Sequence, residues 1–155
     1  MISYFGKINE KDEIILSEMG RIAEKYWLEI PKHFPNVKLG IHQIMPNHIH
    51  GMIEIMSKND IAVSECRDAK FCVSTGENND DFQNKFGPQS RNLGSIIRGF
   101  KSAVKKYATM NNMKFQWQPG YYEEIIKNEK HYNEVYDYIL SNPQTWDRDK
   151  NNPKI

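Results

Sequence analysis

Two histidines stand one residue apart in the apolar stretch IMPNHIHGMIEIM, residues 44–56. Because side chains alternate between the two faces of a β-strand, a strand here would place His48 and His50 side by side on one face. Same-face neighbours lie about 7 Å apart at Cα, which lets both imidazoles reach one cation at about 2.1 Å from each nitrogen. Such a pair leaves coordination positions for water or a phosphate. A solvated polar strand face is the simpler alternative, and an H-x-H motif alone does not exclude it.

A second candidate group lies near the carboxyl end. Apolar spacing predicts a helix that Asn128 caps and Pro143 ends, and its predicted buried stripe consists of Tyr132, Val135, Tyr136, Ile139 and Leu140. Tyr138 falls off that stripe, one turn before Asn142. Phenols are weak nucleophiles, so a metal that polarises the attacked phosphate would be a natural companion. An exposed helix tyrosine without a role is the alternative.

Basic residues are concentrated between residues 91 and 106. They are Arg91, Arg98, Lys101, Lys105 and Lys106. Arg98, Lys101 and Lys105 recur at helical spacing opposite an apolar stripe. Such a row of basic side chains can follow the phosphates of a nucleic acid. A lysine face that serves only solubility has the same pattern, so this signal supports DNA binding without proving it.

The composition is that of one globular domain, residues 1–155, because the chain is 39% hydrophobic and 26% charged. The net charge of +1 gives no global sign of a nucleic-acid or membrane partner, so any basic site must be local. Cys66 and Cys72 suggest neither a disulfide framework nor a zinc ribbon. The sequence shows no signal-peptide core and no apolar run of about 20 residues. We therefore expect a cytoplasmic protein without a membrane partner.

The periodicities that position these residues predict alternating strands and helices. In order they are a short strand before Ser17, a helix from Ser17 to Pro31, strands at 37–45 and 48–56, a helix at 93–108, a strand at 121–126, and the helix from Asn128 to Pro143. Residues 57–92 lack periodicity and are expected to form a long mobile loop. This order predicts an α+β, ferredoxin-like (split βαβ) fold: an antiparallel sheet with two helices on one face, plus a C-terminal catalytic helix.

Three of these segments resemble the single-tyrosine HUH transposases, and more closely their REP-associated tyrosine transposase branch. MPNHIHGMIEI is similar to the family's HUH strand, LGSIIRGFKSAVKKYA to its second helix, and WQPGYYEEIIKNEKHYNEVYDYILSNP to its catalytic segment. The resemblance covers most of the chain outside residues 57–92. Three separated motifs in the right order are a far more specific signal than H-x-H alone.

The resemblance implies a role for each candidate residue. His48 and His50 match the metal-binding histidines, Asn142 the third metal ligand, and Tyr138 the nucleophile, with Mg²⁺ or Mn²⁺ as the cation. The implied reaction is DNA transposition, in which the tyrosine nicks single-stranded DNA folded into a hairpin. A 5′-phosphotyrosine link forms, and a 3′-hydroxyl is released for strand transfer.

The start of the chain departs from the family pattern. In the family an opening strand precedes the segment similar to YFGKI and pairs with the HUH strand, whereas only three residues precede Tyr4 here. The first strand is therefore expected to be missing or shortened, which would expose an edge of the histidine strand. Residues 2–8 could substitute for it, a partner chain could complete the sheet, or the chain could be a truncated copy with poor activity. The implied relatives occur as domain-swapped dimers and as monomers, so a homodimer stays open.

Two other functions fit parts of the pattern. A catalytically impaired, truncated or domesticated relative would keep the basic helix and bind DNA without cutting it. An unrelated metal hydrolase would use the histidine pair with a bound water as nucleophile, and would not need Tyr138.

Overall fold

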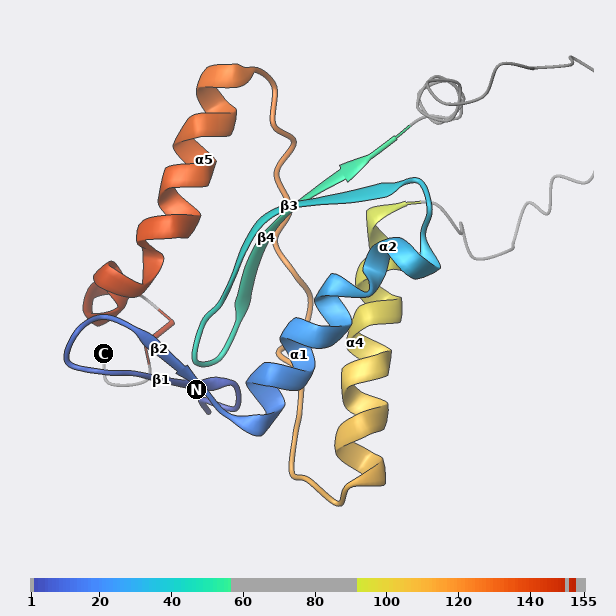
Figure 1. Cartoon of the computed structure of the whole chain (residues 1–155), viewed down its shortest axis with the longest axis vertical. Helices are drawn as coiled ribbons and strands as arrows, with labels where there is room; N and C mark the ends of the chain where they lie inside the picture. The colour runs from blue at the N-terminus through green and yellow to red at the C-terminus, as the bar shows by residue number, and fades with distance from the viewer. Residues whose placement is uncertain (1, 57–91, 150, 153–155) are drawn as a thin grey trace, which may run out of the picture.

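The computed structural model describes residues 2–56, 92–149 and 151–152 (Figure 1). These residues form an α+β structure. In chain order the elements are β1 (Gly6–Ile8), β2 (Ile14–Leu16), α1 (Glu18–Leu28), α2 (Ile30–His33), β3 (Val37–Ile44), β4 (Ile49–Ile55), α4 (Leu93–Met110), α5 (Glu129–Ser141) and the 3₁₀ helix η1 (Asn142–Arg148). Residues 57–91 lie outside the described residues. They include both cysteines, Arg91 and all of the predicted loop at 57–92 except its last residue.

The strands form two separate antiparallel pairs, β1 with β2 and β3 with β4. The β3–β4 hairpin turns at Pro46 and Asn47, as predicted, and has an irregularity between Leu39 and His42. Among the described residues no third strand joins β4, so the four-stranded ferredoxin-like sheet is not confirmed. Residues 121–126 contain no regular secondary structure, and the strand predicted there is wrong. A backbone hydrogen bond from Phe5 N to Pro46 O, 2.9 Å long, connects the N-terminal segment to the turn of the hairpin.

The three long helices begin at side-chain caps. Ser17 accepts a hydrogen bond from Gly20 N at the start of α1, and Asn128 accepts one from His131 N at the start of α5. Pro31 does not end helical structure as predicted, because α1 ends at Leu28 and the proline lies in the first turn of α2. None of the helices in the described ranges has the length and hydrophobicity that crossing a bilayer requires.

Helices α1 and α4 pack together on one side of the β3–β4 hairpin, and α5 lies on the other (Figure 1). Trp27 of α1 contacts both α4 and the hairpin, because its ring lies 5.4 Å from that of Phe100 on α4 and packs against Gly51 of β4. A Cβ on Gly51 would come within 2.3 Å of the Trp27 ring, so this position has no room for a side chain. The buried core consists of Phe5, Met19, Ala23, Trp27, Ile30, Val37, Ile44, Ile96, Phe100, Val104, Ala108 and Phe115.

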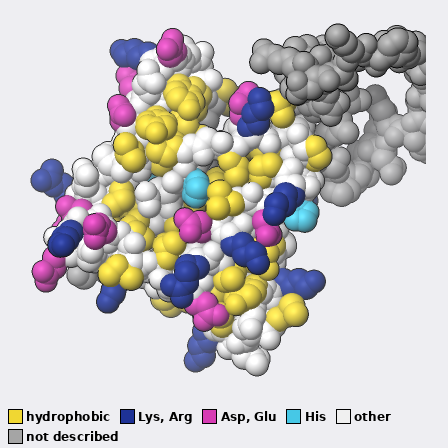
Figure 2. All heavy atoms as spheres, in the orientation of Figure 1, with side chains coloured by type: hydrophobic (Ala, Val, Ile, Leu, Met, Phe, Trp, Pro, Cys, Tyr) yellow, Lys and Arg dark blue, Asp and Glu magenta, His cyan; other side chains and the backbone are white. Residues whose placement is uncertain are grey.

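Helix α5 is covered much less than its sequence predicts. Ile139 is buried, whereas Tyr132, Tyr136 and Leu140 are exposed, so the predicted buried stripe is wrong at these three positions. Figure 2 shows hydrophobic side chains gathered over α5. The helix contacts β3 but has no second layer of described residues outside it, which leaves these three side chains in solvent. Figure 1 shows the same arrangement, with α5 standing apart from α1 and α4.

Candidate metal centre

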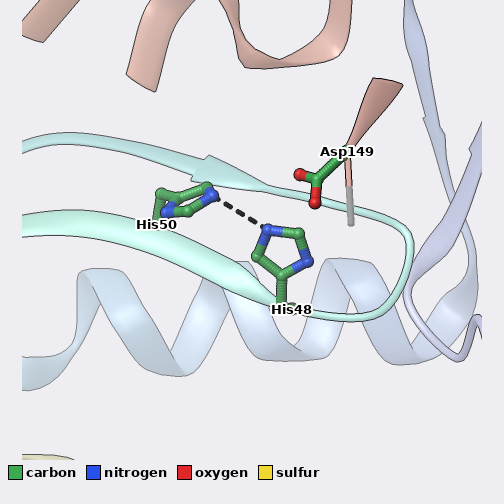
Figure 3. A group of neighbouring side chains, drawn as sticks. All are labelled: His48, His50 and Asp149. Atoms are coloured by element: carbon green, nitrogen blue, oxygen red, sulfur yellow. Dashed lines mark hydrogen bonds between the residues drawn. The ribbon is translucent and has the colours of Figure 1, made fainter. Parts of the chain in front are cut away.

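The two histidines meet at the start of β4. His48 directly precedes the strand and His50 is its second residue, and their Nε2 atoms lie 2.8 Å apart (Figure 3). The rings are nearly perpendicular, at 89°. Both side chains are half-buried, and the buried Trp146 of η1 packs 6.0 Å from the His48 ring. The alternation of a strand therefore brings the two imidazoles together, as the sequence predicts.

Asp149 is the third member of this group. One ligand atom from each of His48, His50 and Asp149 lies within 4.8 Å of the others, and the carboxylate faces the histidine pair (Figure 3). Asp149 caps η1, and its Oδ1 accepts a 2.7 Å hydrogen bond from Asn151 N. Sequence reasoning missed this residue, because nothing in TWDRDK distinguishes it from Asp147.

Tyr138 and Asn142, the other two predicted site residues, lie at the carboxyl end of α5. The Tyr138 ring is 5.4 Å from the His50 ring at 80°, and its side chain is 54% exposed. Asn142 is only 1% exposed, and its Oδ1 has no hydrogen-bond partner among the described residues. A buried acceptor without a donor costs about 1–3 kcal/mol, and a nearby cation is one way to satisfy it.

The donor atoms present fit a divalent cation. Two imidazole nitrogens and one carboxylate oxygen form a mixed nitrogen and oxygen set of the kind that divalent transition metals accept. The unsatisfied amide oxygen of Asn142 adds a further hard donor at the end of the same helix as Tyr138. Three protein ligands would leave positions for water or substrate. The chemistry of the group is thus compatible with a metal centre.

The histidine pair is held in its neutral form. Burial, together with the neighbouring His50, lowers the pKa of His48 to about 4, and Asp149 only partly opposes this. Burial also lowers the pKa of His50, again against the opposing effect of Asp149. Neutral imidazole is the form that binds metals, so the pair is ready to act as ligands at neutral pH.

We expect the metal-free protein to lose stability in acid because of His48. Between the unfolded pKa near 6.5 and the folded pKa near 4, the unfolded state binds a proton that the folded state does not. The free energy of unfolding therefore decreases as the pH is lowered through this range. The full shift is worth about 3 kcal/mol. Urea unfolding at pH 7, 5.5 and 4 measures it. His48→Gln should flatten the pH dependence, whereas the exposed His33→Gln should keep it; equal slopes in both variants would contradict the assignment.

The basic residues of α4 divide into two kinds. Lys101 Nζ donates to Gln118 O at 3.0 Å and to Gly120 O at 2.9 Å, and Lys105 Nζ donates to Phe115 O at 2.5 Å. These two predicted DNA-binding lysines therefore hold the segment after α4 onto the helix, and burial lowers the pKa of Lys101. In the described part of the chain, the exposed Arg98 and Lys106 form no ion pair.

A groove runs along the same side of α4. Its volume is about 540 Å³, and its lining includes Arg98, Lys101, Lys105, Lys106 and Trp117. The Lys101 ammonium lies 5.4 Å from the centre of the Trp117 ring, and Trp117 Nε1 donates to Lys101 O at 2.8 Å. Positive charge next to an aromatic ring is a surface that suits single-stranded nucleic acid.

Comparison with known proteins identifies a relative of this chain. The chain is 36% identical over 147 residues to an uncharacterized protein of Haemophilus influenzae, and the alignment covers 94% of this chain and 76% of that protein. No family model and no solved structure matches the chain.

Proposed function

We propose that this chain, which belongs to the same family as the uncharacterized Haemophilus influenzae protein, is a metal-dependent tyrosine nuclease that nicks single-stranded DNA at hairpins. The relative's description assigns no activity, so the proposal rests on residues of this chain and on the resemblance to REP-associated tyrosine transposases. In this proposal the β3–β4 hairpin and its helices are part of a ferredoxin-like fold, and strand transfer after nicking gives DNA transposition.

The observation that carries the proposal is the contact between Tyr138 and His50. Their rings lie 5.4 Å apart although they come from α5 and β4. Tyr138 is 54% exposed, so a DNA strand can approach its hydroxyl from solvent. A nucleophile beside a group of potential metal ligands is the arrangement that phosphodiester cleavage by a tyrosine requires.

In the proposed reaction each residue has a defined task. His48, His50 and Asp149 would hold Mg²⁺ or Mn²⁺, with Asn142 Oδ1 as a further candidate ligand. The cation would supply Lewis-acid stabilisation of the phosphate charge. The Tyr138 oxygen bonds to phosphorus, and the bond between phosphorus and O3′ breaks. In the net reaction the phenol loses its proton and the leaving O3′ gains one. The products are a 5′-phosphotyrosine and a free 3′-hydroxyl.

The groove on α4 is the proposed path of the DNA backbone. Arg98 and Lys106 line it and are exposed, so both can contact phosphates. Lys101 and Lys105 contribute positive potential while they anchor the segment beside Trp117. Arg91, which lies outside the described residues, belongs to the same predicted basic stretch.

A covalent adduct on DNA tests the proposal. We expect the protein to form one, stable on a denaturing gel, when it is incubated with Mn²⁺ and a pool of labelled single-stranded oligonucleotides that carry hairpins of varied sequence. EDTA should prevent the adduct, and a mass spectrum of the digested product should place the phosphate on tyrosine. Salt-dependent DNA binding without metal binding or an adduct would contradict nicking and support the non-catalytic alternative.

A further inference from the structure

We propose that Asn47 is the positioning residue of the candidate metal centre. Its side chain fixes which nitrogen of His48 is free to bind a cation, and it anchors the turn that presents Asp149. The inference rests on the proposed metal site, but its first readout, the tautomer of His48, does not require a metal.

The orientation of the Asn47 amide is determined by its neighbours. Asn47 is 5% exposed, and its Nδ2 donates a 2.6 Å hydrogen bond to Asn151 O. A carbonyl oxygen can only accept, so the NH₂ group must point at Asn151 and the amide oxygen at His48. That oxygen, Oδ1, lies 2.8 Å from His48 Nδ1.

The tautomer of His48 follows from this orientation. An amide oxygen cannot donate, so His48 Nδ1 must carry the hydrogen, and in the neutral ring Nε2 is then left with its lone pair. His50 Nε2 lies 2.8 Å from this atom and must therefore be the donor to it. The result is a chain of two hydrogen bonds, from His50 Nε2–H to His48 Nε2 and from His48 Nδ1–H to Asn47 Oδ1.

This tautomer is the one that metal binding needs. His48 Nε2 is among the atoms that face His50 and Asp149, and it presents a lone pair without rearrangement. Hydrogen bonds from the outer nitrogen of a ligating histidine fix the ring and raise its basicity. For His50 to bind a cation through Nε2, its hydrogen would move through solvent from Nε2 to Nδ1, whereas His48 needs no such change and keeps its bond to Asn47.

The other end of the Asn47 amide reaches the third ligand. Asn151 accepts from Asn47 through its carbonyl and donates through its N–H to Asp149 Oδ1 at 2.7 Å. This hydrogen bond uses one carboxylate oxygen of Asp149, and the carboxylate faces the histidine pair (Figure 3). The backbone of Asn47 is also held, because Gln118 Nε2 donates to its carbonyl at 3.1 Å. One amide thus ties the turn before β4 to the end of η1.

A long-range ¹H–¹⁵N correlation spectrum of the metal-free protein at neutral pH shows which ring nitrogen of each histidine is protonated, and so tests the proposal directly. In the wild type we expect His48 to be protonated on Nδ1 and His50 on Nε2, each as a single tautomer. His42, on β3, serves as an internal reference whose tautomer should be the same in all variants. A wild-type spectrum with His48 protonated on Nε2 would overturn the proposal without any mutant.

Two substitutions of Asn47 separate its functions. Asn47→Ala should give mixed tautomers at His48, because the hydrogen-bond chain can then run in either direction, and Mn²⁺ affinity should fall about 10- to 100-fold. Asn47→Asp keeps an acceptor for Nδ1–H, so it should keep the wild-type tautomer and lose less affinity. Gln118→Ala, which removes a contact to the backbone carbonyl of Asn47, should leave the tautomer unchanged.

The outcomes distinguish this inference from the proposed function. An Asn47→Ala protein that keeps the single wild-type tautomer would refute the role of Asn47, whatever its metal affinity. A wild type that has the expected tautomer but binds no Mn²⁺ in calorimetry would refute the metal centre, and would leave Asn47 supported as the residue that sets the His48 tautomer.

Discussion

Tyr138→Phe is expected to abolish the covalent protein–DNA adduct, with a loss of at least about 1,000-fold. The substitution removes one oxygen and keeps the ring, so the contact between this side chain and the His50 ring, 5.4 Å away, can persist. Because the side chain is 54% exposed, the free energy of unfolding should change little. The measurement is the amount of labelled DNA that migrates with the protein on a denaturing gel, with circular dichroism to confirm folding.

Tyr136→Phe is the matched control, since Tyr136 lies on the same helix and is also exposed. Its ring stacks on that of Tyr132, with the ring centres 6.3 Å apart, and the proposed reaction gives its hydroxyl no role. We expect a wild-type level of adduct. An adduct that persisted in Tyr138→Phe would remove this tyrosine as the nucleophile. DNA cleavage that survived without any adduct would instead favour the hydrolase alternative, in which a water attacks.

Local signals explain why the helices were predictable. Ser17 and Asn128 each place a side-chain oxygen where helical apolar spacing begins, and both accept a backbone N–H as caps. Such signals act over one turn and need no knowledge of the rest of the fold. The β3–β4 hairpin was predictable for the same reason, because alternation and the Pro46–Asn47 turn are both local.

Signals that depend on distant partners failed. Residues 121–126 have strand-like composition, but a strand forms only against a neighbour, and none of the described strands pairs with them. The stripe of α5 has helical spacing, yet spacing cannot say whether another layer covers it, and Tyr132 and Tyr136 are exposed. Helical spacing predicted Lys101 and Lys105 for DNA binding, but it gave no sign that both also donate to backbone carbonyls.

The site shows the same division between local and distant signals. His48 and His50 are neighbours on one strand, so alternation alone brings them together. Asp149 reaches them only because η1 directly follows α5 and ends beside the histidine pair, and an acidic residue in this part of the sequence gives no sign of that path. Tyr138 could be singled out as off the predicted stripe, but its contact with His50 depends on how α5 packs.

Asp149→Asn is expected to lower the affinity for Mn²⁺ at least about 100-fold, measured by isothermal titration calorimetry. The variant keeps the size of the side chain and an oxygen that can accept from Asn151 N–H, so the turn should stay in place. It removes the negative charge that attracts the cation and that opposes the low pKa of both histidines. Asp147→Asn, two residues earlier and exposed, should bind Mn²⁺ like the wild type.

The same titration decides between two ligand sets. The resemblance to tyrosine transposases implies Asn142 as the third ligand, whereas the structure groups Asp149 with the histidines. If Asn142 alone completes the centre, Asp149→Asn should retain affinity and Asn142→Ala should lose it. If Asp149 is the principal ligand, the charge removed by Asp149→Asn should cost more affinity than the neutral oxygen removed by Asn142→Ala. Comparable losses in both variants would mean that the buried Oδ1 of Asn142, unsatisfied in the described residues, is satisfied by the same cation.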